Sequence, residues 1–263
     1  MAEGTVEIER SGPVAWVWMS RPTVHNALNE EMIRELPAAI RSLGEDATVR
    51  VIVLAGRGKS FSAGADAEWM KRQGAAGGLE NLEGARQLAE MFHAIAVCPK
   101  PTIARVNGAA IGGGLGFVSV CDIAIASTAA IFAASEVRLG LIPATIGPYV
   151  VQAIGPRCAR RLFLTGERVS AAYAEKIGLV HEAVGPEEID AKVDALIQDL
   201  LAGAPGAQKA AKNLIDTIAG RPMAPELMEE TAVRIATIRS EPEAQEGLVA
   251  FLERRPASWV PPR

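Results

Sequence analysis

The stretch TIARVNGAAIGGG, residues 102–114, decides the fold. It opens with the β-forming, mostly apolar run 102–106, turns at Asn107-Gly108 and closes on three consecutive glycines. The runs VIVLA at 51–55 and IAIA at 123–126 have the same character. Short apolar runs that alternate with helical stretches are typical of strands buried on both faces of a sheet. We therefore predict strand-helix units around these three runs.

Helical patterns lie between the predicted strands. Ile33, Leu36, Ile40 and Leu43 recur at a spacing of three and four residues, and Asn29 precedes them as an N-cap. A second apolar helix face runs through residues 82–95. Glycines at positions 74, 77 and 78 come before it, and we expect a mobile loop there.

The strand pattern ends near residue 185, and only helical patterns follow. They cover residues 187–201, 207–218, 225–238 and 242–252. We therefore predict an α/β core over residues 1–200 and a helical region over residues 201–263. Terminal helices with no strands to cover often pack on a neighbouring subunit, so we expect an oligomer.

Composition excludes several classes of protein. The 263 residues include 27 Lys and Arg against 31 Asp and Glu, a net charge of -4. This balance gives no support to a nucleic-acid or membrane surface and favours a small-molecule partner. The uncharged, mostly apolar stretch 106–121 is too short and too rich in glycine to span a bilayer. Three scattered cysteines suit a reducing compartment, and we see no signal segment, so we expect a cytoplasmic protein.

Several familiar motifs fail on spacing. Gly58-Lys59-Ser60 resembles the end of a phosphate-binding loop, but Val53 stands where that motif needs its first glycine. The glycines from Gly112 onward resemble a dinucleotide loop, but Phe117 stands at the place of the third glycine. The three histidines lie at no metal-ligand spacing, and the chain has no Gly-x-Ser-x-Gly motif, so we predict neither a metal nor a serine nucleophile.

Two glycine-rich turns remain, each following a predicted buried strand. They are FSAGAD at 61–66 and NGAAIGGG at 107–114. Small residues expose peptide N–H groups, and a helix that begins near Gly113 adds the positive end of its dipole. Two N–H groups that converge from different loops would form an oxyanion hole. Tight turns that merely pack closely would give the same pattern.

At these residues the chain resembles the crotonase family, the enoyl-CoA hydratases and isomerases. The resemblance covers essentially the whole chain in order. It rests on the two turns, on Cys121-Asp122 and on the run SEVRLGLIP at 135–143. The opening RP at 21–22 with NALN at 26–29, and the closing EGLVAFLERR at 246–255, match too. It implies a spiral of repeated ββα units with a C-terminal helical trimerisation region, in a trimer or a dimer of trimers.

The resemblance implies an acyl-CoA thioester substrate and no separate cofactor, since coenzyme A is part of the substrate. Its carbonyl oxygen would lie between the N–H groups of Ala65 and Gly113, and Glu136 would transfer protons. The first glutamate of two-glutamate hydratases falls on Gly116 and is missing. Glu68 is a candidate to replace it, although an exposed, solvated carboxylate is the interpretation that we favour.

The missing glutamate leaves the reaction class open. One carboxylate suffices for an enoyl-CoA isomerase, whereas hydration must also activate water. The context from Phe61 to Lys71 and from Glu136 to Val150 resembles bacterial 3-methylglutaconyl-CoA hydratases, which carry glycine at the same position. We therefore predict a hydratase, acting on a 2-enoyl-CoA that could be branched. The alternatives are an isomerase and a non-catalytic acyl-CoA-binding relative.

The resemblance also implies further residues that bind the substrate. The backbone near Ala27 would hold coenzyme A, Arg21 or Lys59 could pair with its phosphates, and Trp69 and Met70 would line the acyl pocket. Phe251 and Arg254 match positions that reach coenzyme A across a subunit boundary in relatives. The remaining predicted contacts are Ala63, Gly64, Asp66, Gly112 and Gly116.

Overall fold

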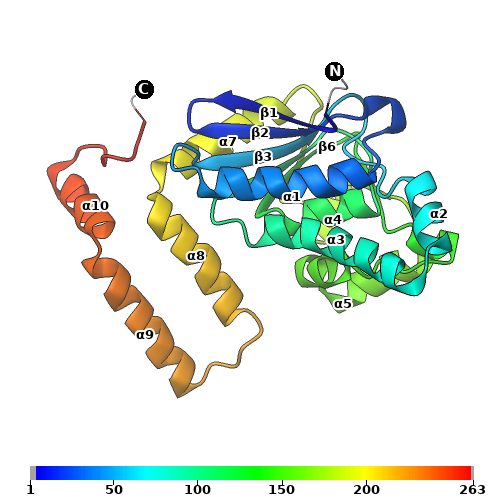
Figure 1. Cartoon of the computed structure of the whole chain (residues 1–263). Coiled ribbons are helices and arrows are strands. Elements are labelled where there is room, and N and C mark those ends of the chain that lie inside the picture. The colour runs from blue at the N-terminus through cyan, green and yellow to red at the C-terminus, as the bar shows by residue number, and fades with distance from the viewer. Residues whose placement is uncertain (1–3, 262–263) are drawn as a thin grey trace.

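The computed structural model describes residues 4–261 as an α/β core from which a tail of helices extends (Figure 1). A six-stranded sheet forms the centre of the core, in the order β1-β2-β3-β4-β6-β9. β1 is antiparallel to β2, and every other neighbouring pair in this sheet is parallel. The strands are β1 (Val6–Ser11), β2 (Val14–Met19), β3 (Val51–Gly56), β4 (Thr102–Val106), β6 (Ile123–Ser127) and β9 (Glu182–Val184).

A second, smaller sheet lies beside the first. It has the order β5-β7-β8, formed by β5 (Ala110–Ile111), β7 (Ile131–Ala133) and β8 (Val169–Ser170). The helices of the core are α1 (Glu30–Glu45), α2 (Ala67–Ala75), α3 (Gly78–Ala96), α4 (Gly113–Val120), α5 (Gly147–Thr165), α6 (Ala171–Lys176) and α7 (Ile189–Ala202). Short 3-10 turns cover Pro22–Val24 and Glu136–Leu139.

The central strands are buried on both faces, as the sequence predicts. Every residue of β3 is buried. Ile52 and Leu54 belong to the large core cluster that includes α1 and α3, whereas Val51 and Val53 pack with α7. Alternate side chains of a strand point to opposite faces, so one apolar strand serves two layers of helices. This explains why the pattern is a continuous apolar run.

Helix α1 begins where its cap residue predicts. The side chain of Asn29 accepts a hydrogen bond from the Met32 N–H at 3.0 Å, which satisfies one of the free donors of the first turn. Met32, Ile33, Leu36, Ile40 and Leu43 are buried along the face that the spacing indicates.

The prediction of a mobile loop around the glycines at 74, 77 and 78 is wrong. Residues 67–75 form α2, α3 begins at Gly78, and only Ala76 and Gly77 lie between them. The Asp66 carboxylate accepts hydrogen bonds from the N–H groups of Glu68 and Trp69 and so starts α2 before the glycines are reached. The two helices form one wall of the cavity described below.

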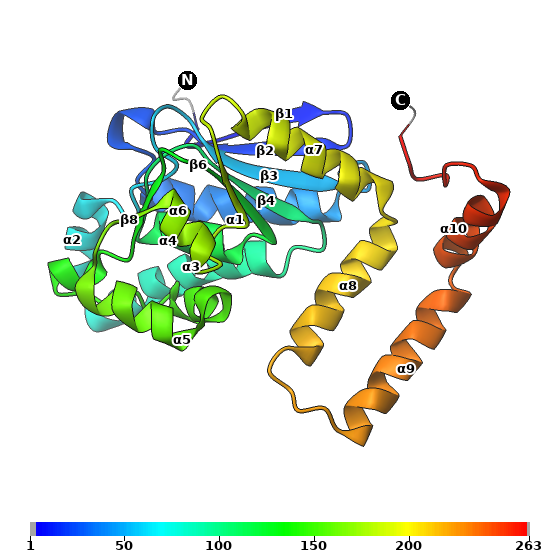
Figure 2. The ribbon, with the colours of Figure 1, turned by 180° about the vertical axis from the view of Figure 1, so that it is seen from behind.

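After α7 the chain turns away from the core (Figure 2). The tail consists of α8 (Pro205–Ile218), α9 (Pro225–Ser240) and α10 (Pro242–Glu253), close to the predicted helical patterns. The Lys212 ammonium on α8 donates to Asp122 at 2.7 Å and to the Lys100 carbonyl at 3.1 Å, and these bonds tie the first tail helix to the core. Within residues 4–261, every helix is too short or too polar to cross a bilayer.

Candidate active site

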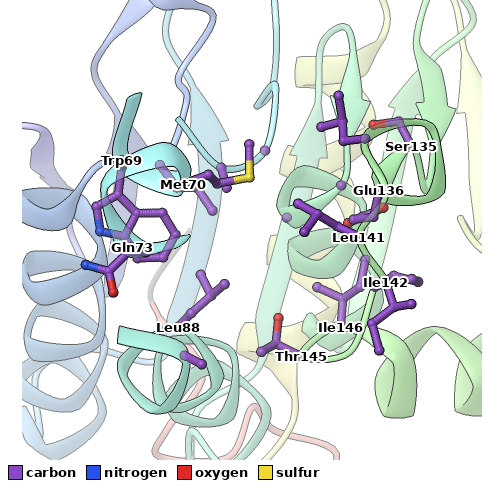
Figure 3. A pocket seen from close by; sticks show the side chains of 18 of the residues that line it. Trp69, Met70, Gln73, Leu88, Ser135, Glu136, Leu141, Ile142, Thr145 and Ile146 are labelled. Carbon is purple, nitrogen blue, oxygen red and sulfur yellow. The ribbon is translucent and has the colours of Figure 1, made fainter. Parts of the chain in front are cut away.

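A cavity of about 360 Å³ lies between the α2–α3 wall and the loop that follows β7 (Figure 3). Most of its lining is apolar, with Trp69, Met70 and Leu88 on one side and Leu141, Ile142 and Ile146 on the other. The structure brings eight of the predicted site residues to this cavity. They are Ala63, Gly64, Ala65, Trp69, Met70, Gly112, Gly113 and Glu136.

The two glycine-rich turns pack directly against each other. Isolated parallel bridges join Leu28 to Ala65 and Ser62 to Ala110. Gly64 has a φ of +83°, and a Cβ on it would lie 2.6 Å from the Ile111 carbonyl oxygen and 3.1 Å from the Gly113 nitrogen. A larger residue at 64 would therefore be strained and would also push the turns apart.

The peptide N–H groups of Ala65 and Gly113 have no acceptor among residues 4–261. Gly113 is the first residue of α4, where a helix leaves its N–H groups free. Three of the neighbouring groups are bonded: Gly64 N–H to Ser62 Oγ, Asp66 N–H to the Leu28 carbonyl and Gly112 N–H to the Ala133 carbonyl. Two free donors at one cavity can bind an oxygen on which negative charge develops.

Among the residues that line the cavity, Glu136 alone carries a carboxyl group, and this group lies beside the pair of turns. Its Oε1 lies 3.1 Å from the point that a Cβ on Gly112 would occupy, so the bare Cα of Gly112 lets the carboxyl approach. Oε2 is buried and has no hydrogen-bond partner among the described residues. Burial raises the pKa of Glu136, although a hydrogen bond from its own backbone N–H opposes the shift. A carboxyl with a raised pKa can both accept and release a proton near neutral pH.

Position 116 has no room for a side chain. A Cβ on Gly116 would overlap Ile146 Cγ2 and lie 2.9 Å from Phe92 Cε1. Gly116 itself does not line the cavity, because Ile146 and Phe92 cover it. Glu68 is exposed and is absent from the lining, so it does not take the place of a second carboxylate.

Comparison with known proteins agrees with this geometry. A family model described as enoyl-CoA hydratase/isomerase matches residues 9–261. The chain belongs to this family. Crotonyl-CoA hydratase of Syntrophomonas wolfei is 33% identical over 270 residues, which cover 99% of this chain and 99% of that protein.

Solved structures of the enoyl-CoA hydratase/isomerase family share the whole architecture. An enoyl-CoA hydratase from Shewanella pealeana is 38% identical, with a TM-score of 0.94 over 97% of this chain and 96% of that one. An enoyl-CoA hydratase/isomerase from Marinobacter aquaeolei is 33% identical, with a TM-score of 0.92 over 98% of this chain and 99% of that one. The predicted family and fold class are therefore confirmed.

The residues that the family resemblance assigns to coenzyme A form a cluster next to the cavity. The Arg21 guanidinium donates to Asp66 Oδ2 at 3.0 Å and also to the Ala27 carbonyl oxygen. Burial would raise the pKa of Asp66, but the hydrogen bonds from Arg21 and the α2 backbone lower it. Neither Ala27 nor Asp66 lines the cavity itself, and Lys59 is exposed.

Phe251 and Arg254 are not at the cavity of their own chain. Both lie at the end of α10, and Figure 1 shows this helix on the opposite side of the core from α2. The Phe251 side chain is 80% exposed.

Several lining residues were missed by the sequence analysis. Thr145 and Ile146 belong to the run 136–150 that carries part of the family resemblance, yet nothing in that run assigned their side chains to the cavity. Leu88 and Phe92 lie on the predicted helix face, and periodicity assigns them to the core without saying that part of that face borders a cavity.

A double-mutant cycle tests the packing at Gly116. Alanine in place of glycine stabilises an ordinary helix by about 1 kcal/mol. We expect Gly116→Ala to lower the free energy of unfolding by about 1–3 kcal/mol instead, because the added methyl overlaps Ile146. In the double variant with Ile146→Ala, the loss of unfolding free energy should be smaller than the sum of the two single-variant losses by about 1 kcal/mol or more. Urea unfolding of the four proteins measures this, and additive costs would contradict the contact.

The raised pKa of Glu136 predicts a pH-dependent gain in stability for Glu136→Gln. Burial disfavours the carboxylate in the folded state, so at neutral pH the neutral glutamine variant should have the larger free energy of unfolding. The difference should shrink as the pH falls through the raised pKa and vanish below the ordinary value of 4.5. Urea midpoints over a pH series measure it, with exposed Glu68→Gln as control. A variant no more stable than the parent at neutral pH would refute the assignment.

Proposed function

We propose that this protein is an enoyl-CoA hydratase that adds water reversibly to a 2-enoyl-CoA thioester. One observation carries the proposal: two unbonded peptide N–H groups, from Ala65 and Gly113, border the same cavity as a single buried carboxyl group, Glu136. The names of the relatives from Syntrophomonas wolfei and Shewanella pealeana support the same activity.

The first step forms a bond between the water oxygen and C3 of the substrate. Glu136, as the carboxylate, takes one proton from that water. The electrons of the C2–C3 double bond move to the thioester carbonyl, which becomes an enolate. The N–H groups of Ala65 and Gly113 bind the enolate oxygen, and losing one such donor typically costs about 3–4 kcal/mol of transition-state stabilisation.

The second step returns the proton. Glu136, now a carboxylic acid, donates to C2, the enolate collapses to the thioester, and the carboxylate is regenerated. The net change is one water added, with its hydroxyl on C3 and a hydrogen on C2. A single carboxyl group therefore suffices, provided that its pKa lies near the working pH.

The proposed coenzyme A site lies at the outer end of the two turns. The backbone around Ala27, together with Ala63 and Asp66, would hold the adenine and pantetheine. Arg21 already binds Asp66 and the Ala27 carbonyl, so we assign it to shaping this cradle, and Lys59 remains the exposed candidate for a phosphate. Gly64 and Gly112 would serve by their lack of a side chain.

An enoyl-CoA isomerase is the second candidate, and Gly116 is the observation that favours it. An isomerase removes a proton from C2 of a 3-enoyl thioester and returns it at C4, which needs no water. A cavity whose position 116 is covered by Ile146 offers one carboxyl group for that transfer. A non-catalytic acyl-CoA-binding protein is the third candidate.

Of the acyl groups considered, we propose crotonyl as the preferred one. A 3-methylglutaconyl group carries a second carboxylate, and burying an unpaired charge is costly. No lysine or arginine of residues 4–261 lines the cavity, so this carboxylate would have to reach solvent or a neighbouring subunit.

Absorbance of the conjugated enoyl thioester tests the proposed activity with crotonyl-CoA and 3-methylglutaconyl-CoA. We expect the absorbance to fall and mass spectrometry to show the gain of one water. Glu136→Gln should reduce kcat by about 100-fold or more, because it removes the proton-transfer group. Binding of the thioester should change little, and exposed Glu68→Gln should behave as the parent. A fully active Glu136→Gln variant would exclude this mechanism, and a parent active only on 3-enoyl-CoA would favour the isomerase.

The helical tail supports a homo-oligomer, which we propose to be a trimer or a dimer of trimers. No residue of α8 is buried within its own chain, and apolar side chains are exposed on α9 and α10. The most exposed of these side chains are Met228, Val233, Ile235, Leu248, Phe251 and Leu252. A cytoplasmic location remains our proposal from the sequence.

Light scattering tests the assembly. We expect a mass three or six times that of the 27.7 kDa chain. Replacing Phe251 and Leu252 by serine should reduce the mass while the circular dichroism of the core persists, because the change removes exposed apolar surface and no core contact. A parent that is monomeric at micromolar concentration would refute the proposal.

A further inference from the structure

Asn26 is a fully buried polar residue beside the first glycine-rich turn. Its φ of +55° lies in the left-handed region, which asparagine tolerates better than most residues. Its side-chain Oδ1 accepts a hydrogen bond from the Arg21 N–H at 2.9 Å. Its Nδ2 donates to the carbonyl oxygens of Arg57 at 2.9 Å, Ser60 at 2.8 Å and Phe61 at 3.2 Å. One carboxamide therefore fixes three carbonyl groups of the loop that leads from β3 into the turn.

Ser62 links Asn26 to the backbone of the turn itself. The Ser62 Oγ donates to the Asn26 carbonyl oxygen at 2.9 Å and accepts from the Gly64 N–H at 3.2 Å. Ser62 is fully buried, so these bonds lie in surroundings of low dielectric constant, where hydrogen bonds are stronger. Asn26 thus holds the turn at two places, through its carboxamide at residues 60–61 and through the Ser62 hydroxyl at Gly64.

The bonds at Gly64 determine the direction of the Ala65 N–H. The Leu28 N–H donates to the Gly64 carbonyl oxygen at 2.8 Å, and the Asp66 N–H donates to the Leu28 carbonyl oxygen at 2.9 Å. The Gly64–Ala65 peptide is trans, and the C=O and N–H groups of a planar trans peptide point in opposite directions. Because the Gly64 C=O points at the Leu28 N–H, the Ala65 N–H points away from it.

We propose that Asn26 is a positioning residue that, through Ser62, directs the Ala65 N–H at the thioester carbonyl oxygen. The inference rests on the proposed function, in which this N–H binds the enolate oxygen. Asn26 does not line the cavity and touches no reacting atom. Gly64 has a φ of +83° and no side chain to restrict its rotation, so the peptide that follows it keeps its direction through bonds to other segments.

Asn29 offers a matched control in the same stretch of chain. Its side chain also bonds to backbone, but it accepts from the Met32 N–H and caps α1. It does not line the cavity, and among residues 4–261 its side chain bonds to no part of the turn. Loss of such a cap weakens folding. Asn29→Ala therefore separates lost stability from lost positioning.

The test uses two variants. Asn26→Gly keeps the left-handed backbone and loses the carboxamide, and Ser62→Ala loses only the hydroxyl that joins Asn26 to Gly64. Two quantities are measured: kcat for the hydration of crotonyl-CoA, and the infrared stretching frequency of the isotope-labelled thioester carbonyl in bound butyryl-CoA. Hydrogen bonds to a carbonyl oxygen lower this frequency, so it reports on the donors and not on the amount of folded protein.

We expect both variants to lower kcat by about 10- to 100-fold, because a displaced donor stabilises the enolate less. They should also lose about half of the downward frequency shift that the parent produces, since one of two donors is displaced. The dissociation constant of butyryl-CoA should rise by no more than about fivefold. Asn29→Ala should give the frequency of the parent and a kcat within about twofold of it.

The outcomes separate this inference from the proposed function. A parent that binds butyryl-CoA without lowering its carbonyl frequency overturns the role of Ala65 and the inference with it. If Asn26→Gly does not fold, Ser62→Ala decides: a folded Ser62→Ala variant with the kcat and frequency of the parent overturns the inference alone. An equal loss in Asn29→Ala also overturns it, because any destabilisation would then have the same effect. A parent that lowers the frequency but hydrates neither enoyl thioester overturns the proposed hydration, and a smaller shift in the variants then supports the inference by itself.

Discussion

Close backbone contact between the loop after β3 and the loop after β4 is the constraint on which the site depends. Gly64 meets the Ile111 carbonyl, Gly114 meets the Ser62 carbonyl and Gly108 meets the Lys59 carbonyl at distances that no Cβ would allow. The parallel strands β3 and β4 are neighbours in the sheet, so their carboxyl ends deliver both loops to one edge. Bare backbone on both sides then leaves the N–H groups of Ala65 and Gly113 at a common cavity.

The electrostatic character of the cavity follows from this arrangement. The two unbonded N–H groups at the cavity belong to peptide dipoles that carry no net charge, and burial raises the pKa of the Glu136 carboxyl group. In the proposed mechanism, negative charge that forms on the substrate oxygen would meet two fixed donors while a proton neutralises Glu136. Charge would move from the carboxylate to the enolate and back, and the total charge of the buried site would stay constant.

The sequence predicts the parts of this structure that depend on local pattern. The apolar runs of β3, β4 and β6, the Asn29 cap of α1 and the tail helices are all where periodicity and capping indicate. The glycines at 74, 77 and 78 do not mark a loop, because the Asp66 cap starts α2 upstream of them and α3 begins at Gly78. Ile146 could not have been assigned to the space beside Gly116, since 29 positions of chain separate the two residues and only tertiary packing joins them.

The residues shared by the two candidate reactions do not determine which reaction the protein catalyses. Hydration and isomerisation share the enolate, the two N–H donors and the carboxyl group, so none of these residues distinguishes the two reactions. They differ in whether a water stands beside Glu136 at C3. Whether a water can stand there depends on the cavity wall beside Glu136, where Ile146 and Phe92 cover position 116 and leave no space for a second carboxylate. In the proposed mechanism, the glycine-rich turns and Glu136 supply the enolate chemistry, and the side chains of the surrounding cavity wall decide between hydration and isomerisation.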